Sequence, residues 1–316
     1  MIATLQSLRF VFVMMIFMSH FAYRDMGAFD AGGDCGVVFF FLLSGFVLSL
    51  RYENEIRGGT FQYGKFLKRR FRKLYPLHLL CLSFFLVVSK SGIDLPFLLN
   101  IFLLQSWIPD PDIYFSCNSV SWFLSSLFFC YLVFPFAFRR VSVRWVLFVI
   151  GAYIVVLLLT PYDKVNAILY VNPLVRFTDF YIGIILCRIY ERGYEVPAQK
   201  WLELLLIVVL IVVLTIYPYM DAKFRNAPIF WLVLIPFILV FAKGKGVVSK
   251  WLCQKPMMML ASLSMPLFMT HQILIGILLH RLPQIPVVAM LFACVLVTLA
   301  VSWCIDRYFL RQLERL

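Results

Sequence analysis

The chain has 316 residues, of which 63% are hydrophobic and only 14% are charged. Soluble domains carry roughly 25% charged residues, so this composition excludes a soluble globular protein. The net charge of +13 could indicate a nucleic-acid partner. In so apolar a chain, however, an excess of Lys and Arg is better explained by membrane topology, and we expect no nucleic-acid binding.

Apolar runs of about 20 residues recur along the chain, and a helix of that length crosses about 30 Å of hydrocarbon. Because lipid cannot satisfy open backbone groups, these runs predict an all-α polytopic membrane protein. The first run lacks the basic start and the small-residue cleavage pattern of a signal peptide, so we expect it to stay as a span. The predicted spans are 5–23, 34–50, 121–138, 144–160, 173–190, 200–217, 226–242, 258–279 and 286–305.

One further apolar region, 74–106, is interrupted by the polar stretch Lys90–Asp94 and could contain one crossing or two. Cytoplasmic loops are enriched in Lys and Arg. With the basic segment 51–73 in the cytoplasm and a single crossing in 74–106, 22 of the 29 Lys and Arg residues fall inside. Two crossings would place all later loops on the opposite side of the membrane. We therefore predict one crossing, with 95–106 as a short re-entrant or surface segment.

This layout predicts about ten transmembrane helices in a single domain over 1–316, with both termini cytoplasmic. We expect a multi-pass protein of the inner or plasma membrane, whose chemistry takes place in or at the bilayer. The eight cysteines form no CxxC pair and lie mostly in apolar runs, which is typical of small buried residues. No GxSxG, P-loop or HExxH motif occurs, so we expect no metal and no bound cofactor.

Ionisable residues inside spans are costly and usually functional. The first span contains Arg9 and His20, whose separation of eleven residues is about three helical turns and about 16 Å along one face. The neutral imidazole of His20 could take a proton from a sugar hydroxyl, because the ordinary pKa of histidine lies near physiological pH. The alternative is a histidine held by a backbone carbonyl at a helix end.

Later spans carry a second histidine and a pair of opposite charges. His271 lies at a depth similar to that of His20, which predicts a shared polar cavity reachable from both membrane faces. Arg176 and Asp179 are three residues apart on one helix face. They could contact substrate or form an internal ion pair, and the sequence favours neither.

The densest charge in the chain runs from Lys65 to Lys73, before Tyr75-Pro76. As a helix entering the membrane, it would present several cations to lipid headgroups, which is a sufficient explanation by itself. Binding of a cytoplasmic pyrophosphate would use the same charge but needs particular side chains to converge. The span with Gly36, Ser44 and Gly45 is explained by close helix packing.

Taken in chain order, six elements resemble those of the membrane acyltransferase 3 family, the polysaccharide O-acyltransferases. Each is weak alone, but the six occur in the family's order across nearly the whole chain. They are Arg9 with His20 (R-x10-H), Gly36–Phe46 (GV-x-x-FF-x-x-SGF), Lys68–Pro76 (R-x-x-R-x-x-P), Ser121–Leu124 with Tyr131 and Pro135 (W-x-L…Y…P), Phe180–Gly183, and Ser262–His271, a closing element of serine and histidine.

The resemblance implies a ten-span acyltransferase that transfers an acyl group, commonly acetyl from acetyl-CoA, to a cell-surface glycan or its lipid-linked precursor. His20 and Arg9 match the family's catalytic pair. We expect His20 to act as general base, or as a covalently acylated histidine, and His271 to position it or to stabilise the oxyanion. The other residues expected to bind donor or substrate are Arg69, Arg70, Arg72, Lys73, Ser44, Trp122, Arg176 and Asp179.

Two other functions are compatible with parts of the sequence. A transporter or flippase for a glycan intermediate would also explain polar residues at mid-depth, but it has no obvious need for the Arg9/His20 pair with a basic cytoplasmic stretch. An acyltransferase of another membrane family, acting on lipids or proteins, would keep the chemistry but not the order of the motifs.

Overall fold

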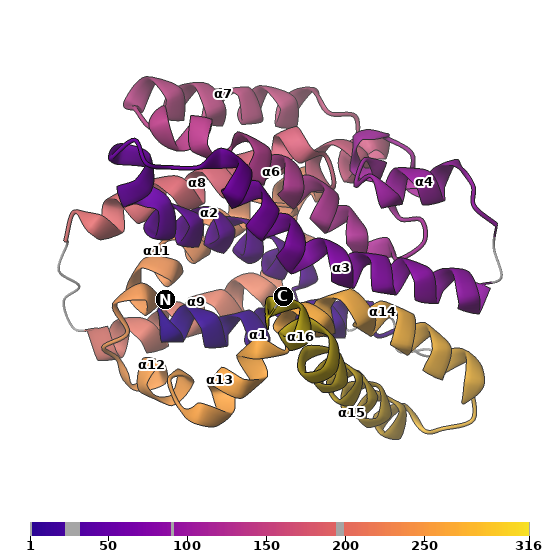
Figure 1. Ribbon diagram of the computed structural model, residues 1–316. Coiled ribbons are helices and arrows are strands. Elements are labelled where there is room, and N and C mark those ends of the chain that lie inside the picture. The colour runs from indigo at the N-terminus through magenta and orange to yellow at the C-terminus, as the bar shows by residue number, and fades with distance from the viewer. Residues whose placement is uncertain (1, 23–31, 90–91, 194–198, 316) are drawn as a thin grey trace.

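The computed structural model describes residues 2–22, 32–89, 92–193 and 199–315, which fold into a bundle of helices without a strand (Figure 1). The long helices are α1 (Ala3–His20), α2 (Gly33–Arg57), α3 (Tyr63–Ser89), α6 (Trp122–Arg139), α7 (Val143–Leu159), α8 (Pro173–Glu191), α9 (Gln199–Ile216), α11 (Pro228–Lys243), α14 (Ser264–Arg281) and α15 (Val287–Ile305). The short helices are α4 (Leu95–Ile101), α5 (Pro111–Tyr114), α10 (Ala222–Arg225), α12 (Val247–Leu252), α13 (Lys255–Ser262) and α16 (Arg311–Arg315).

The all-α, multi-pass membrane class is confirmed. Within the described residues, seven helical segments are long and apolar enough to cross a bilayer, or eight if the bent pair α13–α14 is one span. Ten crossings also require α7, which is apolar but only 17 residues long, and α8, which carries two Arg, one Asp and one Glu. The number of crossings therefore stays a prediction.

The region 74–106 contains one long helix and one short helix. α3 runs to Ser89, and α4 covers only the seven residues Leu95–Ile101. A helix of that length rises about 10 Å, far short of the hydrocarbon thickness. These lengths support a single crossing followed by a short segment, while Lys90 and Ser91 lie outside the described residues.

The predicted span 258–279 is not one straight helix. It is divided into α13 and α14, which meet at an angle of 57°. Pro266 explains the break, because its ring clashes with the carbonyl four residues earlier, at Ser262, and it has no N–H to donate there. The consequence is that α14 begins at Ser264, inside the bundle rather than at its edge.

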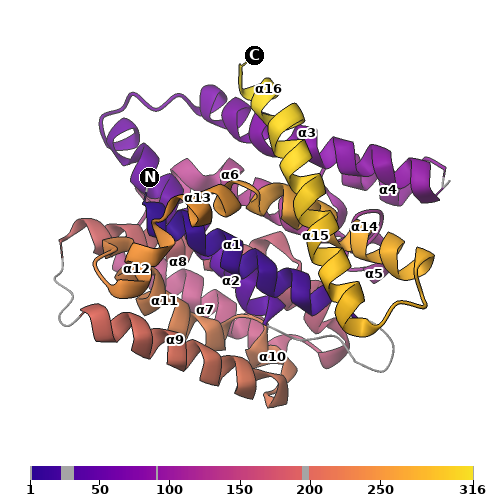
Figure 2. The ribbon, with the colours of Figure 1, turned by 90° about the horizontal axis from the view of Figure 1, so that it is seen from below.

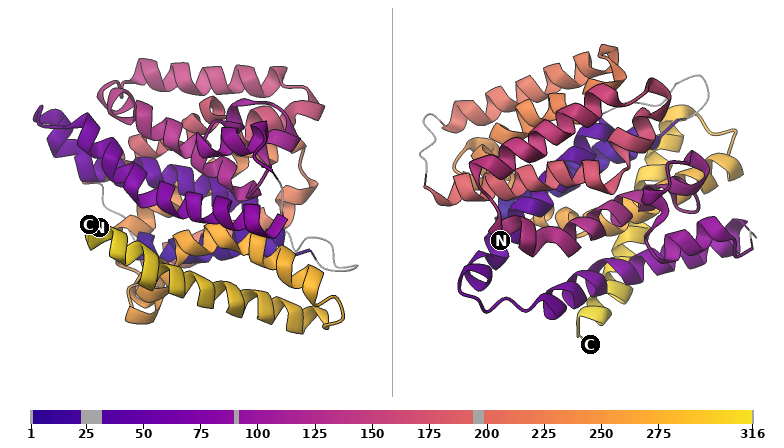
Figure 3. Two further views of the ribbon diagram at one scale, coloured as in Figure 1. Left: turned by 45° about the vertical axis from the view of Figure 1, so that its right-hand side comes forward. Right: turned by 90° about the horizontal axis from the view of Figure 1, so that it is seen from above.

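Segments that the charge count assigned to the cytoplasm lie together at one end of the bundle. Arg188 at the end of α8 approaches Glu53 of α2, and Arg72 of α3 donates to the carbonyl of Leu313 near the C-terminus. Thr4 of α1 donates to the carbonyl of Phe241 at the end of α11. Figure 3 shows both termini at the end where α2 turns into α3.

The tightest helix contact joins α2 and α8 through two glycines. A Cβ on Gly45 would collide with the carbonyl oxygen of Phe180, and a Cβ on Gly183 would collide with that of Leu42. Small residues let the two backbones approach this closely, as expected where membrane helices pack without a hydrophobic driving force. The contact fixes α2, which carries Ser44, against the centre of the bundle.

Replacing Gly183 with alanine should destabilise the protein by about 1–3 kcal/mol, because the added methyl meets backbone that cannot rotate away. Thermal unfolding of detergent-purified protein measures the loss. Gly151→Ala in α7 is the matched control, since its Cβ would meet no atom within 4 Å. That change should be neutral or stabilise by up to about 1 kcal/mol through helix propensity; equal unfolding temperatures for both variants would contradict the packing.

Candidate active site

Helix α1 connects the two parts of the candidate site. It packs against α2, α13 and α14 (Figure 2). Arg9, near its start, faces the beginning of α14 beside Ser264 and Met265. His20, its last residue, meets His271 further along α14. Both residues of the predicted pair therefore face α14, at different depths.

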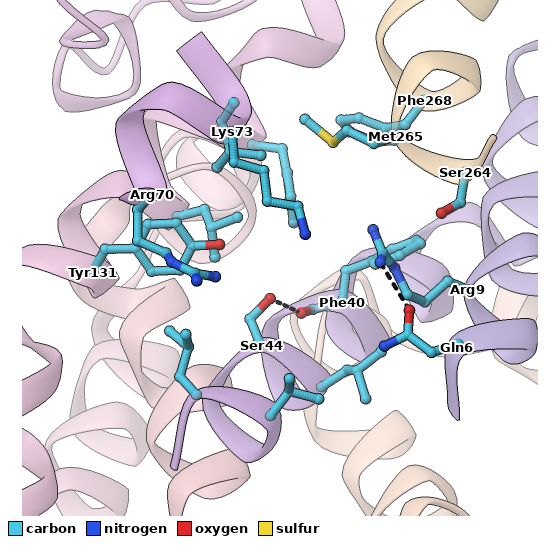
Figure 4. A pocket seen from close by; sticks show the side chains of 16 residues that line it. Gln6, Arg9, Phe40, Ser44, Arg70, Lys73, Tyr131, Ser264, Met265 and Phe268 are labelled. Carbon is cyan, nitrogen blue, oxygen red and sulfur yellow. Dashed lines mark hydrogen bonds between the residues drawn. The ribbon is translucent and has the colours of Figure 1, made fainter. Parts of the chain in front are cut away.

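Arg9 lines a narrow cavity of about 120 Å³ between α1, α2, α3, α6 and α14. Figure 4 shows the side chains of Arg9, Arg70 and Lys73 directed into this space, with Tyr131 at the wall. Ser44 also lines the cavity, and its hydroxyl donates to the carbonyl oxygen of Phe40 at 2.7 Å. The cavity therefore combines three cations with hydroxyl groups inside an otherwise apolar bundle.

A wider vestibule of about 670 Å³ adjoins the narrow cavity and shares Arg9, Arg70 and Lys73 with it. Arg69 and Arg72 complete the cationic wall that α3 contributes. The sequence left open whether these residues only anchor lipid or converge on a ligand. The structure brings all four basic residues predicted on α3 together with Arg9 around one space, which is the arrangement that binding of a phosphate group needs.

The two histidines form a hydrogen-bonded pair. Nε2 of His271 lies 3.2 Å from Nδ1 of His20, which is also 2.8 Å from the carbonyl oxygen of Ile16. Nδ1 of His271 lies 2.8 Å from the carbonyl oxygen of Phe268. His271 is fully buried, whereas His20 is half-buried.

These contacts determine where the protons lie when both rings are neutral. A carbonyl oxygen only accepts, so both Nδ1 atoms must carry hydrogen. Nε2 of His271 is then an acceptor for the Nδ1–H of His20, and Nε2 of His20 is left with a lone pair. His20 is thus both held by a backbone carbonyl, as the simpler interpretation expected, and set up with its outer nitrogen as a base.

Three phenylalanine rings separate the two parts of the site. Phe40, Phe123 and Phe268 all line the narrow cavity, and their ring centroids lie 5.1–6.4 Å apart. Phe268 also packs against His271, with centroids 6.1 Å apart. His20 lines neither cavity. The two cavities that contain Arg9 therefore do not reach His20, and a polar cavity shared by the two histidines and reachable from both membrane faces stays a prediction.

A buried polar segment that the sequence analysis missed holds α14 at the level of His271. Asn118 donates from Nδ2 to the carbonyl oxygen of Met269 at 2.8 Å, and Ser119 donates to the side chain of Gln272. Behind it, His78 is fully buried with Nε2 2.8 Å from the carbonyl oxygen of Asn100. His78 could have been noticed as an ionisable residue inside a span, whereas nothing in the sequence marks Asn118.

Arg176 and Asp179 form a buried ion pair at 2.7 Å, with both side chains 1% exposed. The guanidinium of Arg176 also donates to the carbonyl oxygens of Leu169, Tyr170 and Asn226. Asp179 accepts from the indole N–H of Trp231 at 2.6 Å. Neither residue lines the vestibule or the narrow cavity, so the geometry favours the internal ion pair over the substrate contact.

Trp122 lies at the start of α6 and is 5% exposed. Its ring packs on Tyr170 with centroids 4.7 Å apart, and its carbonyl oxygen accepts from Ser106 at 2.9 Å. It lines neither the vestibule nor the narrow cavity. A role of Trp122 in substrate binding therefore stays a prediction, while its packing role is evident.

One group of potential metal ligands exists among the described residues. The ligand atoms of Glu53, Cys187 and Glu191 lie within 4.8 Å of one another. Arg57 approaches the carboxylate of Glu53 at 2.5 Å and Arg188 approaches it at 3.7 Å. Two guanidinium groups beside the carboxylate already balance its charge, which makes this an ion-pair network rather than a built cation site.

The fold and the site define the class of protein. It is an integral membrane protein with a basic vestibule at one end of its helix bundle and a histidine pair deeper inside. The sequence profile described as an acyltransferase domain matches residues 2–307. The chain therefore belongs to the membrane acyltransferase 3 family. This membership removes support from the transporter alternative.

Two curated relatives match parts of the chain. The acyltransferase MdmB of Streptomyces mycarofaciens is 37% identical over 118 residues, which cover 34% of this chain and 29% of the relative. Protein 2 in the picA locus of Rhizobium radiobacter is 38% identical over 79 residues, which cover 24% of this chain and 41% of that protein. The chain thus matches less than half the length of either relative. No solved structure matches the chain.

Proposed function

We propose that this acyltransferase transfers an acyl group, acetyl in the first instance, from a coenzyme A thioester to a hydroxyl of a cell-surface glycan or its lipid-linked precursor. One observation carries the proposal: a single helix, α1, places a cation in the basic vestibule and, deeper in the bundle, a histidine whose Nε2 has no hydrogen-bond partner in the described part of the chain. The inner or plasma membrane, with both termini and the vestibule in the cytoplasm, is part of the proposal.

The vestibule suits the phosphate-rich end of the donor. Arg9, Arg69, Arg70, Arg72 and Lys73 line a volume of about 670 Å³, within the range of small-molecule sites. The adjoining narrow cavity of about 120 Å³ is apolar along much of its wall and leads from the vestibule toward Phe268. We infer that the thin arm of the thioester enters it and that rotation of the phenylalanine rings admits the thioester to the histidine pair.

The reaction needs only the protein's own groups and the two substrates. Nε2 of His20 takes the proton of the acceptor hydroxyl while the hydroxyl oxygen bonds to the thioester carbonyl carbon. The tetrahedral intermediate then expels the thiolate as the carbon–sulfur bond breaks. The imidazolium returns its proton to that sulfur, so the products are an ester and free coenzyme A.

His271 is assigned a positioning role. Its Nδ1–H donates to a backbone carbonyl and its Nε2 accepts from His20, so the neutral ring has no free N–H for an oxyanion. It instead fixes the orientation of His20 and stabilises the imidazolium that forms. Asn118 and Ser119 donate hydrogen bonds to α14 on either side of His271 and so support that orientation.

Mass spectrometry of surface glycans from cells with and without this protein tests the proposal. We expect acyl esters, measured as a mass gain of one acetyl group per modified sugar, only when the protein is present. In parallel, purified protein should release free thiol from acetyl-CoA when acceptor is supplied. Unchanged glycans together with no thiol release would contradict the proposal, and movement of unmodified glycan across vesicles would favour the transporter.

A further inference from the structure

The C-terminal segment 306–313 forms a wall of the basic vestibule. After α15 the helix widens into a π-helical turn at Asp306–Leu310 and continues as α16. Asp306, Leu310, Arg311 and Leu313 of this segment line the vestibule opposite α3. The guanidinium of Arg72 donates to the carbonyl oxygen of Leu313 at 3.4 Å, and Figure 2 shows the end of α15 and α16 beside the first half of α3.

Arg311 is tied to Asp306 across the π-helical turn. Its Nε and Nη2 lie 2.9 and 2.8 Å from one carboxylate oxygen of Asp306. The side chain of Asp306 is 13% exposed, whereas that of Arg311 is 61% exposed. π-helical turns often occur at functional sites, and this one lets residues five apart in sequence face each other inside the vestibule.

Asp306 is the only acidic residue among the described residues that line the vestibule, while six lining residues are Lys or Arg. A carboxylate within a cluster of cations holds a position that a phosphate oxygen could take. Because the side chain of Arg311 is mostly exposed, solvent screens its pair with Asp306, and the pair contributes little to stability. Arg311 can therefore exchange the carboxylate for a doubly charged phosphate at small cost, with the paired hydrogen bonds that a guanidinium offers to phosphate.

We propose that Arg311 binds a phosphate of the donor nucleotide, and that Asp306 occupies Arg311 when the donor is absent. This inference rests on the proposed function, because it names a further ligand-binding residue of the same vestibule. The vestibule then has two cationic walls, one from α3 and one from the C-terminal segment, with Arg9 between them. Donor binding would draw the C-terminal segment onto the nucleotide and release Asp306.

Binding of coenzyme A to the full-length purified protein, measured by calorimetry at fixed salt, tests this assignment. Arg311→Ala should weaken binding about tenfold, the loss of one charge-assisted pair. Asp306→Asn should strengthen binding several-fold, because it removes the competing carboxylate. Arg307→Ala is the matched control: Arg307 belongs to the same turn but lies over the rings of Trp303 and Tyr308, outside the vestibule, and its affinity should stay within twofold of wild type.

Each outcome separates this inference from the proposed function. If Arg311→Ala binds coenzyme A as well as Arg307→Ala does, the assignment of Arg311 is wrong. If Asp306→Asn binds more weakly than wild type, Asp306 does not compete with the donor. If Arg70→Ala abolishes binding but Arg311→Ala does not, the proposed function stands and the role of Arg311 is wrong. If the wild-type protein binds no coenzyme A, both the proposed function and the role of Arg311 are wrong. A melting curve for each variant verifies that it folds.

Discussion

Replacement of His20 by alanine should lower acyl transfer by about 10²–10⁴-fold, the usual contribution of a positioned general base. His20 is the one member of the pair whose Nε2 has no hydrogen-bond partner among the described residues, since its Nδ1–H is directed to Ile16 and His271. Without that lone pair, no other described group of the proposed mechanism removes the proton of the hydroxyl. Acyl esters on surface glycans, measured per molecule of membrane-inserted protein, report the loss.

His280→Ala serves as the control for His20, because His280 is an exposed histidine at the end of α14. It should acylate at the wild-type rate. His20 is half-buried at the last residue of its helix, so its loss should leave the amount of folded protein unchanged. Wild-type acylation by the His20→Ala protein would refute the role of this histidine.

Loss of Arg176 should be the most damaging single change to stability among those argued above, at about 3–5 kcal/mol. Its removal leaves Asp179 as an uncompensated charge in the bundle and frees three carbonyl oxygens of Leu169, Tyr170 and Asn226. These carbonyls belong to the π-helical turn before α8 and to the C-terminal end of α10, so the change should loosen both. Thermal unfolding of Arg176→Ala in detergent measures the effect.

Arg144→Ala provides the comparison for Arg176, because Arg144 is exposed near the start of α7. Its unfolding temperature should match that of wild type within error. An Arg176→Ala protein that unfolds at the wild-type temperature but needs more acceptor to reach half-maximal rate would instead assign Arg176 to substrate binding.

The spans were predictable because hydrocarbon imposes one requirement on every segment that crosses it. Runs of apolar residues must be helical and about 20 residues long, and predicted spans such as 173–190 and 200–217 agree with α8 and α9 to within a residue or two. The bend at Leu263 was missed because a proline three residues into a helix is compatible with either a start or a kink. Only the packing of α13 and α14 decides between them.

Parts of the candidate site were predictable from depth alone. His20 and His271 were expected at one level, and a helix rises by a fixed amount per residue, so their meeting followed from the topology. The basic residues of α3 were expected near the cytoplasmic end for the same reason. Which of them share a space with Arg9 depends on helix rotation and packing, which no periodicity in these uniformly apolar spans reveals.

Other contacts depend on residues far apart in sequence and could not be predicted. Glu203 lies in the apolar run of α9, where a carboxylate suggests function. In the fold it accepts hydrogen bonds from the backbone N–H groups of Gly246 and Ser249 and caps α12. The hydrogen bond from Asn118 to the carbonyl oxygen of Met269 joins residues 151 positions apart in sequence. The contacts among the rings of Phe40, Phe123 and Phe268, which separate the two parts of the site, likewise join three helices.

In the proposed mechanism α1 joins a donor-binding end to a reacting end, and the functions of the two ends should be separable by mutation. The most direct test measures coenzyme A binding and acceptor-dependent thiol release on the same purified samples of His20→Ala and Arg70→Ala. We expect His20→Ala to bind coenzyme A with wild-type affinity but to release no thiol above background, while Arg70→Ala should lose affinity and recover thiol release at high donor concentration. If His20→Ala lost donor affinity, or if Arg70→Ala bound normally, the separation of donor binding in the vestibule from proton transfer at His20 would be contradicted.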